Sequence, residues 1–262
     1  MNINKIIRSL ALFVAVLGVA QLSAQPLTKL NKGLPCINKK FQVHAHVILD
    51  SLGVAQSTAE ALQSAFAEVN EAFAPICVSF EVCSADTINN YEFDSIATFP
   101  ESEEMKNLFH LENRINFYLA TELMPGVGGF ATLCGVKQMN NGAVFLKGIG
   151  AGTIIHELGH LFGLEHTFEG SGIELVNGSN CETEGDKICD TPADPYVNGE
   201  DFSQYINLET CEFISIKRDS MNQFYQPDVG NFMSYYPCAC GFTRGQYIKM
   251  AEQFLISDPK MW

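Results

Sequence analysis

Residues 156–166, which read HELGHLFGLEH, constrain this chain more than any other stretch. His156 and His160 are four residues apart, so a helix would place both imidazoles on one face, one turn apart. Two imidazoles in that relation can bind one metal ion, and Glu157 beside them can reach a water bound to that ion. If the helix continued, His166 would lie about 9 Å beyond His160 along the axis, out of reach of the same ion. The pattern therefore predicts a helix that ends between His160 and His166.

Gly163 is the residue that can end this helix, because glycine adopts the left-handed conformation without a Cβ penalty. The chain then turns back and brings His166 to the metal. Three neutral imidazoles leave zinc an open position for water, which is the arrangement of a catalytic site. We therefore predict His156, His160 and His166 as zinc ligands and Glu157 as the general base. The alternative is a core helix with incidental histidines, but half of the six histidines fall in this stretch, each at a ligand position.

Residues 1–24 have the pattern of a secretory signal peptide, with two positive charges, an apolar run over residues 10–20 and then small residues. The apolar run is too short to span a bilayer. We expect cleavage after Ala24 in preference to Ala20; the alternative is retention as a membrane anchor. Residues 25–262 are long enough for one catalytic domain of one or two lobes. The sequence therefore predicts a secreted protein, either extracellular or periplasmic.

The formal net charge is −14, and removal of the two positive charges in the signal segment leaves −16. A strongly acidic chain repels nucleic acid and anionic membranes and attracts basic peptides. We therefore expect a protein or peptide substrate, with no nucleic acid partner and no stable membrane association. Solubility alone is the simpler explanation of the charge.

Nine cysteines in an exported chain predict disulfides, with at least one thiol left over. Their spacing does not determine the pairing. Cys238 and Cys240 are too close along an extended chain to bond each other comfortably. Cys36 has two alternatives, a disulfide to Cys77 or Cys83, or a thiolate bond to zinc in a latent form of the enzyme.

Residues 35–163 predict a mixed α/β lobe, because strand patterns alternate with helical patterns. Glycines before residue 130 indicate an edge strand whose backbone is approached closely. His44 and His46 share one strand face, either as a structural pair or as a second metal pair. Ser102 is the expected N-cap of the weaker helix. Strands are predicted over residues 41–49, 76–83, 115–120, 130–133 and 143–146, and helices over residues 57–73 and 102–111.

Residues 170–230 lose this periodicity and predict irregular structure held by disulfides. Within it, Asp186, Asp190 and Thr191 concentrate oxygen ligands that suit calcium, although the pattern is not an EF-hand. A solvated acidic loop is the alternative. Residues 246–255 predict a closing helix.

Met233 lies in the segment NFMSYY, in a predicted tight turn. Taken alone it would be core filler, but after the histidine motif it predicts an apolar floor beneath the zinc ligands, known as a Met-turn. Tyr235, two residues later, can donate a hydrogen bond to a developing oxyanion.

The segments HELGHLFGLEHTF, GDKICDTPA and NFMSYY resemble the pappalysin family, also called cytophagalysins, a branch of the metzincin zinc metallopeptidases. The motifs that carry the resemblance lie within residues 150–250. It implies an α/β (α+β) fold of the metzincin type, with a mixed twisted sheet, an active-site helix and an irregular, disulfide-bearing C-terminal lobe. The expected lobes are residues 35–163 and 164–262, on either side of a substrate cleft.

The resemblance also implies roles for residues of this chain. It assigns zinc to His156, His160 and His166, catalysis to Glu157 and Tyr235, and the Met-turn to Met233. In such enzymes the substrate pairs antiparallel with an edge strand, for which residues 129–133 are the candidate. Calcium sites after the zinc helix favour Asp186, Asp190 and Thr191, and two disulfides are expected in the C-terminal lobe.

We therefore predict a secreted zinc-dependent endopeptidase, with Zn²⁺ and also Ca²⁺ as candidate cofactors. One alternative is an exported, non-catalytic binding protein stabilised by zinc. Glu157 speaks against it, since a purely structural zinc site has no use for that carboxylate. A zinc hydrolase acting on a non-peptide substrate is a third hypothesis that the motif leaves open.

Overall fold

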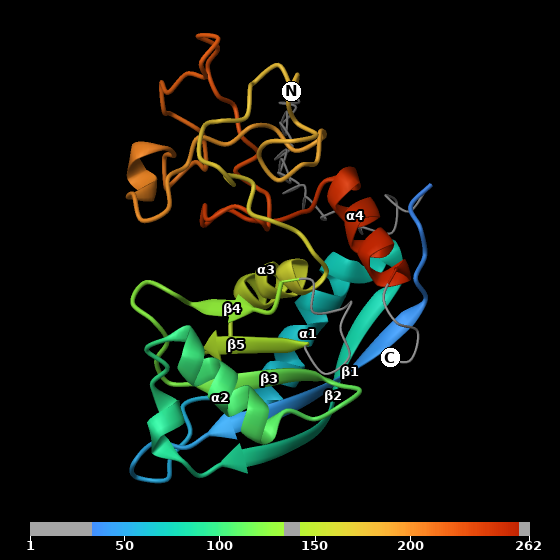
Figure 1. The fold of residues 1–262 in the computed structure, drawn as a ribbon, viewed down its shortest axis with the longest axis vertical. Helices are drawn as coiled ribbons and strands as arrows, with labels where there is room; N and C mark the ends of the chain where they lie inside the picture. Colours follow the sequence, from blue (N-terminus) through green and yellow to red (C-terminus); the bar gives the residue numbers. More distant parts are fainter. Residues whose placement is uncertain (1–32, 134–141, 257–262) are drawn as a thin grey trace, which may run out of the picture.

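The computed structural model describes residues 33–133 and 142–256, so the predicted signal peptide lies outside the described residues. A five-stranded sheet with the order β2-β1-β3-β5-β4 occupies the lower half of Figure 1. Four of its strands are parallel, and the short edge strand β4 runs antiparallel to β5. The strands are β1 (Lys39–Ile48), β2 (Val78–Ile88), β3 (Ile115–Ala120), β4 (Gly129–Ala131) and β5 (Ala143–Lys147).

Helices cover both faces of the sheet (Figure 1). The helices α1 (Ala59–Phe73) and α3 (Ala151–Leu161) share one apolar core with β1 and β3, in which Phe66, Phe117 and Leu158 are fully buried. The helix α2 (Phe99–Phe109) packs on the opposite face, where Met105 is fully buried. The sheet is therefore the middle layer between two distinct cores.

Two predicted boundaries were wrong for identifiable reasons. The helix α2 begins at Phe99 rather than after Ser102, because Thr98 and Glu101 form a capping box in which the Glu101 carboxylate accepts from the Thr98 N–H. The strand β2 continues to Ile88, well past the predicted end at Cys83. Cys83 is the extra residue of a β-bulge, which breaks the alternation on which the prediction depended.

Residues 164–243 lie above α3 in Figure 1 and contain no strand longer than an isolated bridge. Two disulfides tie this segment together, Cys181–Cys189 and Cys211–Cys238. The last helix, α4 (Arg244–Leu255), returns to the first core, where the Tyr247 hydroxyl donates to the Ala72 carbonyl over 2.8 Å. The predicted irregular, disulfide-bearing region and the mixed α/β class are confirmed.

A third disulfide joins Cys36 to Cys77. The latent form in which Cys36 binds zinc is therefore wrong, and the alternative disulfide is the correct one, because both sulfur atoms are already used. Cys83 and Cys240 are the free, exposed thiols among the described residues. Across the described residues, every helix is too short or too polar to cross a membrane.

Candidate metal centre and cleft

The helix α3 ends where the histidine motif requires it to end. The Gly163 N–H donates to the His160 carbonyl over 2.9 Å, and the Leu164 N–H donates to the Gly159 carbonyl over 3.0 Å. These two bonds form a Schellman motif, whose central residue must be left-handed. Gly163 has a φ of +89°, so it takes the conformation that a residue with a Cβ adopts only with strain. The turn reverses the chain toward His166.

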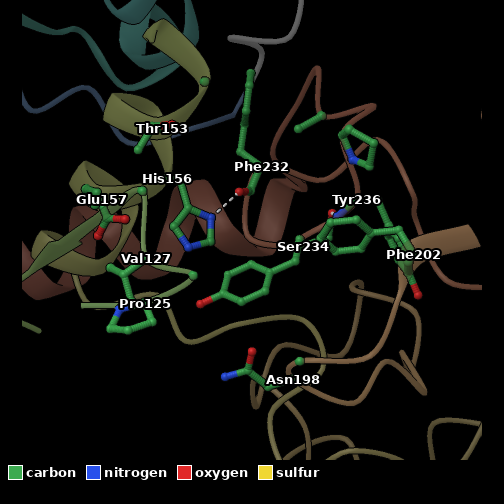
Figure 2. Close-up of a pocket in the computed structure, with 18 residues that line it drawn as sticks. Pro125, Val127, Thr153, His156, Glu157, Asn198, Phe202, Phe232, Ser234 and Tyr236 are labelled. Atoms are coloured by element: carbon green, nitrogen blue, oxygen red, sulfur yellow. Dashed lines mark hydrogen bonds between the residues drawn. The ribbon is translucent and has the colours of Figure 1, made fainter. Parts of the chain in front are cut away.

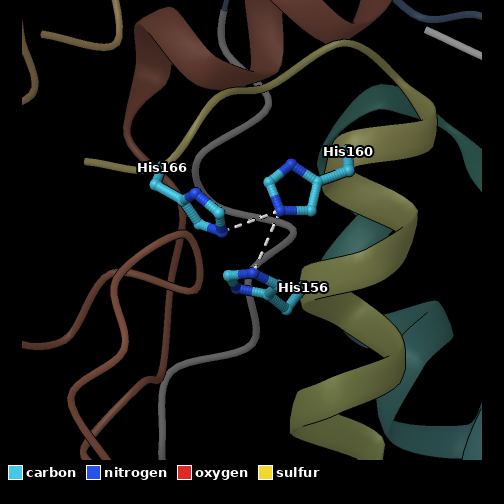
Figure 3. Close-up of side chains that lie close together, drawn as sticks. All are labelled: His156, His160 and His166. Atoms are coloured by element: carbon cyan, nitrogen blue, oxygen red, sulfur yellow. Dashed lines mark hydrogen bonds between the residues drawn. The ribbon is translucent and has the colours of Figure 1, made fainter. Parts of the chain in front are cut away.

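The imidazoles of His156, His160 and His166 converge on one point (Figure 3). The Nε2 atom of His160 lies 3.1 Å from the Nε2 atoms of both other rings. Two nitrogens bound to one zinc at 2.0–2.1 Å in tetrahedral geometry are about 3.3 Å apart. The three ligand atoms therefore have nearly the spacing that a single zinc ion needs.

Hydrogen bonds fix the tautomers of two of these rings. His156 Nδ1 lies 2.6 Å from the Phe232 carbonyl, and His160 Nδ1 lies 2.7 Å from the Leu164 carbonyl. A carbonyl only accepts, so each Nδ1 carries the proton and each Nε2 presents a lone pair to the centre. Burial lowers the pKa of His156 to about 3 and that of His166 to about 2, so both rings are neutral near pH 7. Nitrogen lone pairs that face one another cannot form hydrogen bonds, because none of them carries a proton. Three neutral imidazole nitrogens are instead a donor set that fits a divalent zinc ion.

Met233, the predicted Met-turn residue, packs against the helix α3 at Gly159. Its side chain is fully buried, and its sulfur occupies the space where a Cβ at position 159 would stand. Gly159, the fourth residue of HELGH, has no side chain, and Met233 occupies the space that a Cβ there would take. Sequence reasoning identified Met233 but missed Gly159; the small residue between the two helical histidines was the available signal.

Glu157 lies on α3 beside the cluster, at the wall of a cleft of about 670 Å³ (Figure 2). The residue is 4% exposed, and its Oε2 atom is buried without a hydrogen-bond partner. Burial raises the pKa of Glu157 to about 8 in the metal-free protein, which makes it a stronger base than an exposed glutamate. Tyr235 lines the same cleft, with its ring 4.8 Å from the His166 ring.

A second compartment of about 410 Å³ adjoins the first and is lined by all three histidines. His156, Glu157 and Tyr235 line both compartments, so they occupy the point where the two meet. The strand β4 borders the second compartment. Gly129 allows this strand to approach α3, because a Cβ there would stand 3.0 Å from Thr153 and 3.1 Å from Glu157. The predicted edge strand is confirmed, although it is shorter, ending at Ala131.

The candidate calcium ligands are only partly brought together. Asp186 Oδ2 and Thr191 Oγ1 are buried without hydrogen-bond partners. Asp190 instead accepts from the Thr243 hydroxyl and the Gly245 N–H at the start of α4. Glu174, which sequence reasoning missed, is 5% exposed, and burial followed by the charge of Asp186 raises its pKa to about 7. No sequence motif points to Glu174, because only the fold of the irregular segment places it near Asp186.

Two family models match this chain. The model described as pregnancy-associated plasma protein-A matches residues 140–255, and the model described as metallo-peptidase family M12B reprolysin-like matches residues 59–167. Both matches include the stretch HELGHLFGLEH at residues 156–166. The two models therefore agree on the part of the chain that carries the histidine cluster.

Curated relatives show the same likeness. An extracellular metalloprotease of Pyricularia oryzae is 26% identical over 260 residues, which cover 92% of this chain and 83% of that protein. Pappalysin-1 of Homo sapiens is 31% identical over 166 residues, which cover 56% of this chain and 10% of that protein. The first relative thus matches along nearly the whole chain, and the second matches over a small part of a much larger protein.

Two solved structures share the fold. Mature mirolysin of Tannerella forsythia, in complex with a cleaved peptide, has a TM-score of 0.50 at 17% identity and covers 86% of this chain and 100% of that chain. A promirolysin mutant has a TM-score of 0.53 at 16% identity, covering 86% of this chain and 83% of that chain. At this identity the likeness concerns the fold.

Proposed function

We propose that this chain is a pappalysin-like metzincin metallopeptidase, an exported zinc endopeptidase that uses Glu157 as its general base. The observation that carries the proposal is the position of the Glu157 carboxylate. It is buried, has an oxygen without a partner, and stands beside three convergent imidazoles where two compartments of a cleft meet. A structural zinc site would not need a carboxylate in that position.

In the proposed reaction His156, His160 and His166 hold zinc. Zinc bound there polarises the scissile carbonyl and lowers the pKa of a water. Glu157 takes a proton from the water as the water oxygen bonds to the carbonyl carbon. Glu157 then gives that proton to the leaving amine as the C–N bond breaks. The Tyr235 phenol donates a hydrogen bond to the carbonyl oxygen as negative charge develops on it. Met233 supports the imidazoles from below.

The substrate in this proposal is an extended peptide that crosses both compartments and pairs antiparallel with β4, at the edge of the sheet. The two sides of the cleft are the proposed lobes, residues 35–163 and 164–262, with α4 returning to pack on the first. Export is supported by the predicted signal peptide over residues 1–24 and by relatives that are extracellular metalloproteases.

The test is the variant Glu157→Gln, assayed on unfolded casein with zinc content measured in parallel. We expect zinc to remain and proteolysis to fall by on the order of 10²–10⁴-fold, because only the proton acceptor is lost. Glu104→Gln is a matched control, since Glu104 is exposed on α2 away from the cleft, and it should keep full activity. Undiminished proteolysis by a zinc-loaded Glu157→Gln protein would contradict the mechanism. A wild-type protein that binds zinc but cleaves nothing would favour the non-catalytic alternative.

Calcium is a second proposed cofactor, held by Glu174, Asp186 and Thr191. Glu174 and Asp186 are nearly buried carboxylates without a cationic partner among the described residues, so keeping both ionised has a large desolvation free energy. Hard cations such as calcium prefer carboxylate oxygens and would offset that free energy. Burial raises the pKa of Asp186 as well, to about 7, so the metal-free site favours protonated acids. Asp190 is left out of this set because its two oxygens hold the start of α4.

Thermal unfolding with and without calcium tests this site. We expect calcium to raise the melting temperature of the wild-type protein, by several degrees if the ion is present at about 100 times its dissociation constant. Asp186→Asn and Glu174→Gln should remove most of that rise, whereas Glu182→Gln, an exposed change in the same segment, should keep it. Equal calcium-dependent rises in all of these proteins would exclude this ligand set.

A further inference from the structure

A second histidine cluster lies on the face of the sheet opposite α3. His44 and His46 extend from β1, and Asp86 extends from β2. The two histidines are 4% and 0% exposed, and one ligand atom from each of the three residues lies within 4.8 Å of the others. The neighbouring core is that of α2, whereas α3 packs on the other face. The proposed peptidase site makes no use of this cluster.

The bulge at Cys83 creates the cluster. Before it, Val43 of β1 is opposite Val82 of β2; after it, His44 is opposite Ser84 and His46 is opposite Asp86. Side chains alternate between faces, so the extra residue moves the even-numbered positions of β2 from the α1 face to the α2 face. Phe80 accordingly lies in the first core and Ile88 in the second. Without the bulge, Asp86 would point away from both histidines.

The tautomer of His46 is set by Asn116 on β3. The Asn116 side-chain nitrogen donates to the carbonyls of Leu111 and Arg114, and its Oδ1 accepts from the Leu111 N–H. This orientation makes Oδ1 an acceptor, so His46 Nε2, 2.9 Å away, must carry a proton. In the neutral ring, Nδ1 then presents a lone pair to the Asp86 carboxylate at 2.9 Å. A lone pair facing a carboxylate needs a cation between them or an added proton.

His44 supplies the second nitrogen. Its Nδ1 lies 2.7 Å from the Ser84 hydroxyl, which can accept the ring N–H. Its Nε2 is buried without a hydrogen-bond partner and lies 3.3 Å from Asp86 Oδ2. Asp86 itself is about half exposed, so the carboxylate side of the cluster is open to water. The two rings are thus held from behind by Ser84 and Asn116, as ligating histidines usually are.

We infer that His44 Nε2, His46 Nδ1 and the Asp86 carboxylate bind a second divalent transition-metal ion. His46 Nδ1 lies 2.9 Å from Asp86 Oδ1 and His44 Nε2 lies 3.3 Å from Asp86 Oδ2, and all three ligand groups lie within 4.8 Å of one another. These distances are near the roughly 3.3 Å between ligands of a tetrahedral zinc ion. Two imidazoles and one carboxylate are ligands that suit zinc and its neighbours in the first transition row. The ion joins β1 to β2 just beyond the bulge, and the open side of Asp86 leaves room for water to complete its coordination. It acts on stability and not on peptide hydrolysis.

Zinc content measured by mass spectrometry of the full-length protein, equilibrated with zinc in excess calcium, tests the inference. We expect about two zinc ions per wild-type chain. The double variant His44→Gln, Asp86→Asn should bind about one and keep casein hydrolysis within about twofold. His110→Gln is the matched control, since His110 contacts Asn116 but lies outside the ligand set, and it should keep both ions.

The complementary variant, His156→Gln with His160→Gln, should keep the one ion that the double variant loses. If it fails to fold, cobalt titration of the wild-type protein replaces it, with two sets of absorption bands expected and one set lost on His44→Gln. One zinc per wild-type chain, unchanged by His44→Gln, Asp86→Asn, would overturn the inference and leave a protonated His46–Asp86 ion pair instead.

Discussion

The two histidine clusters of this protein lie on opposite faces of one sheet and are built in different ways. The first takes His156 and His160 from successive turns of a single helix and His166 from the segment that follows the turn ending it. The second takes its residues from two strands that are forty residues apart and depends on a bulge for their alignment. In each cluster two rings are fixed by a hydrogen bond at the nitrogen that faces away from the centre.

The surroundings of the two clusters also differ, in a way that suits one to a reaction and the other to a structural role. Beside the first cluster stand a buried carboxylate without a partner and a cleft with two compartments. Beside the second, the carboxylate is itself part of the cluster, and none of its three residues lines either compartment of the cleft. In our proposals, an ion at the first cluster therefore faces the peptide cleft, while an ion at the second joins two strands.

The largest effect should come from Gly163→Val, which removes the turn that delivers His166. Valine at a φ of +89° is strained, and relief of that strain moves His166 out of reach. We expect zinc to leave the first cluster and proteolysis to fall by at least about 10³-fold, since the metal supplies several kcal/mol of transition-state stabilisation. The far-ultraviolet circular dichroism should remain close to that of the wild type. Zinc content and casein hydrolysis provide the measurement.

Gly178→Val is the control for backbone strain alone. Gly178 has a φ of +70° and open space around it, and it belongs to neither cluster. It should lower the melting temperature but retain zinc at both sites. A Gly163→Val protein that kept full zinc would show that the turn is not what brings His166 to the metal.

A smaller effect is expected from Tyr235→Phe, which tests whether the first cluster is a reaction centre rather than a second structural clamp. The ring contacts with His156 and His166 remain, and only the hydroxyl is lost. Loss of one oxyanion donor should lower kcat by about 10²–10³-fold, with zinc content and KM little changed. Tyr225→Phe removes a buried hydroxyl from the irregular segment and should reduce stability but not kcat. Equal kcat values for Tyr235→Phe and the wild type would remove the proposed role of the phenol.

How much could be predicted depended on how close together the residues lie in the sequence. The residues of the first cluster lie within eleven consecutive positions, so helical geometry and the glycine turn were enough to predict them. The strand Ile115–Ala120 and the body of α1 were predicted correctly, because each satisfies its own periodicity. By contrast, Glu174 approaches Asp186 only through an irregular fold without periodicity, and residue types alone cannot show that approach.

The second cluster was visible only as a pair of histidines on one strand face. Its third member depends on the bulge at Cys83, and alternation counted through that residue assigns Asp86 to the wrong face. Asn116 was hidden for another reason, since the strand INFYLA reads as apolar and its single amide gave no hint of a role. The start of α2 differs from the prediction because both Thr98 and Ser102 suit an N-cap, and only Thr98 has a glutamate three residues later that accepts from its N–H.

The smallest effect on proteolysis should come from Asn116→Ala, which sharpens the contrast between the two clusters. The change leaves the Leu111 N–H, two carbonyls and the His46 ring without their buried partner. Each lost partner costs roughly 1–3 kcal/mol when the group stays buried, so we expect unfolding to become easier by about 3 kcal/mol in total after local relaxation. The affinity of the second cluster for zinc should fall, since an unanchored His46 no longer holds Nδ1 toward Asp86.

Chemical denaturation and casein hydrolysis measured at the same temperature separate the effect on stability from any effect on catalysis. Asn89→Ala, an exposed change near the end of β2, is the control. If Asn116→Ala lowered kcat of the folded protein as Tyr235→Phe is expected to do, the two faces of the sheet would be coupled, and the division between a reacting cluster and a structural one would fail.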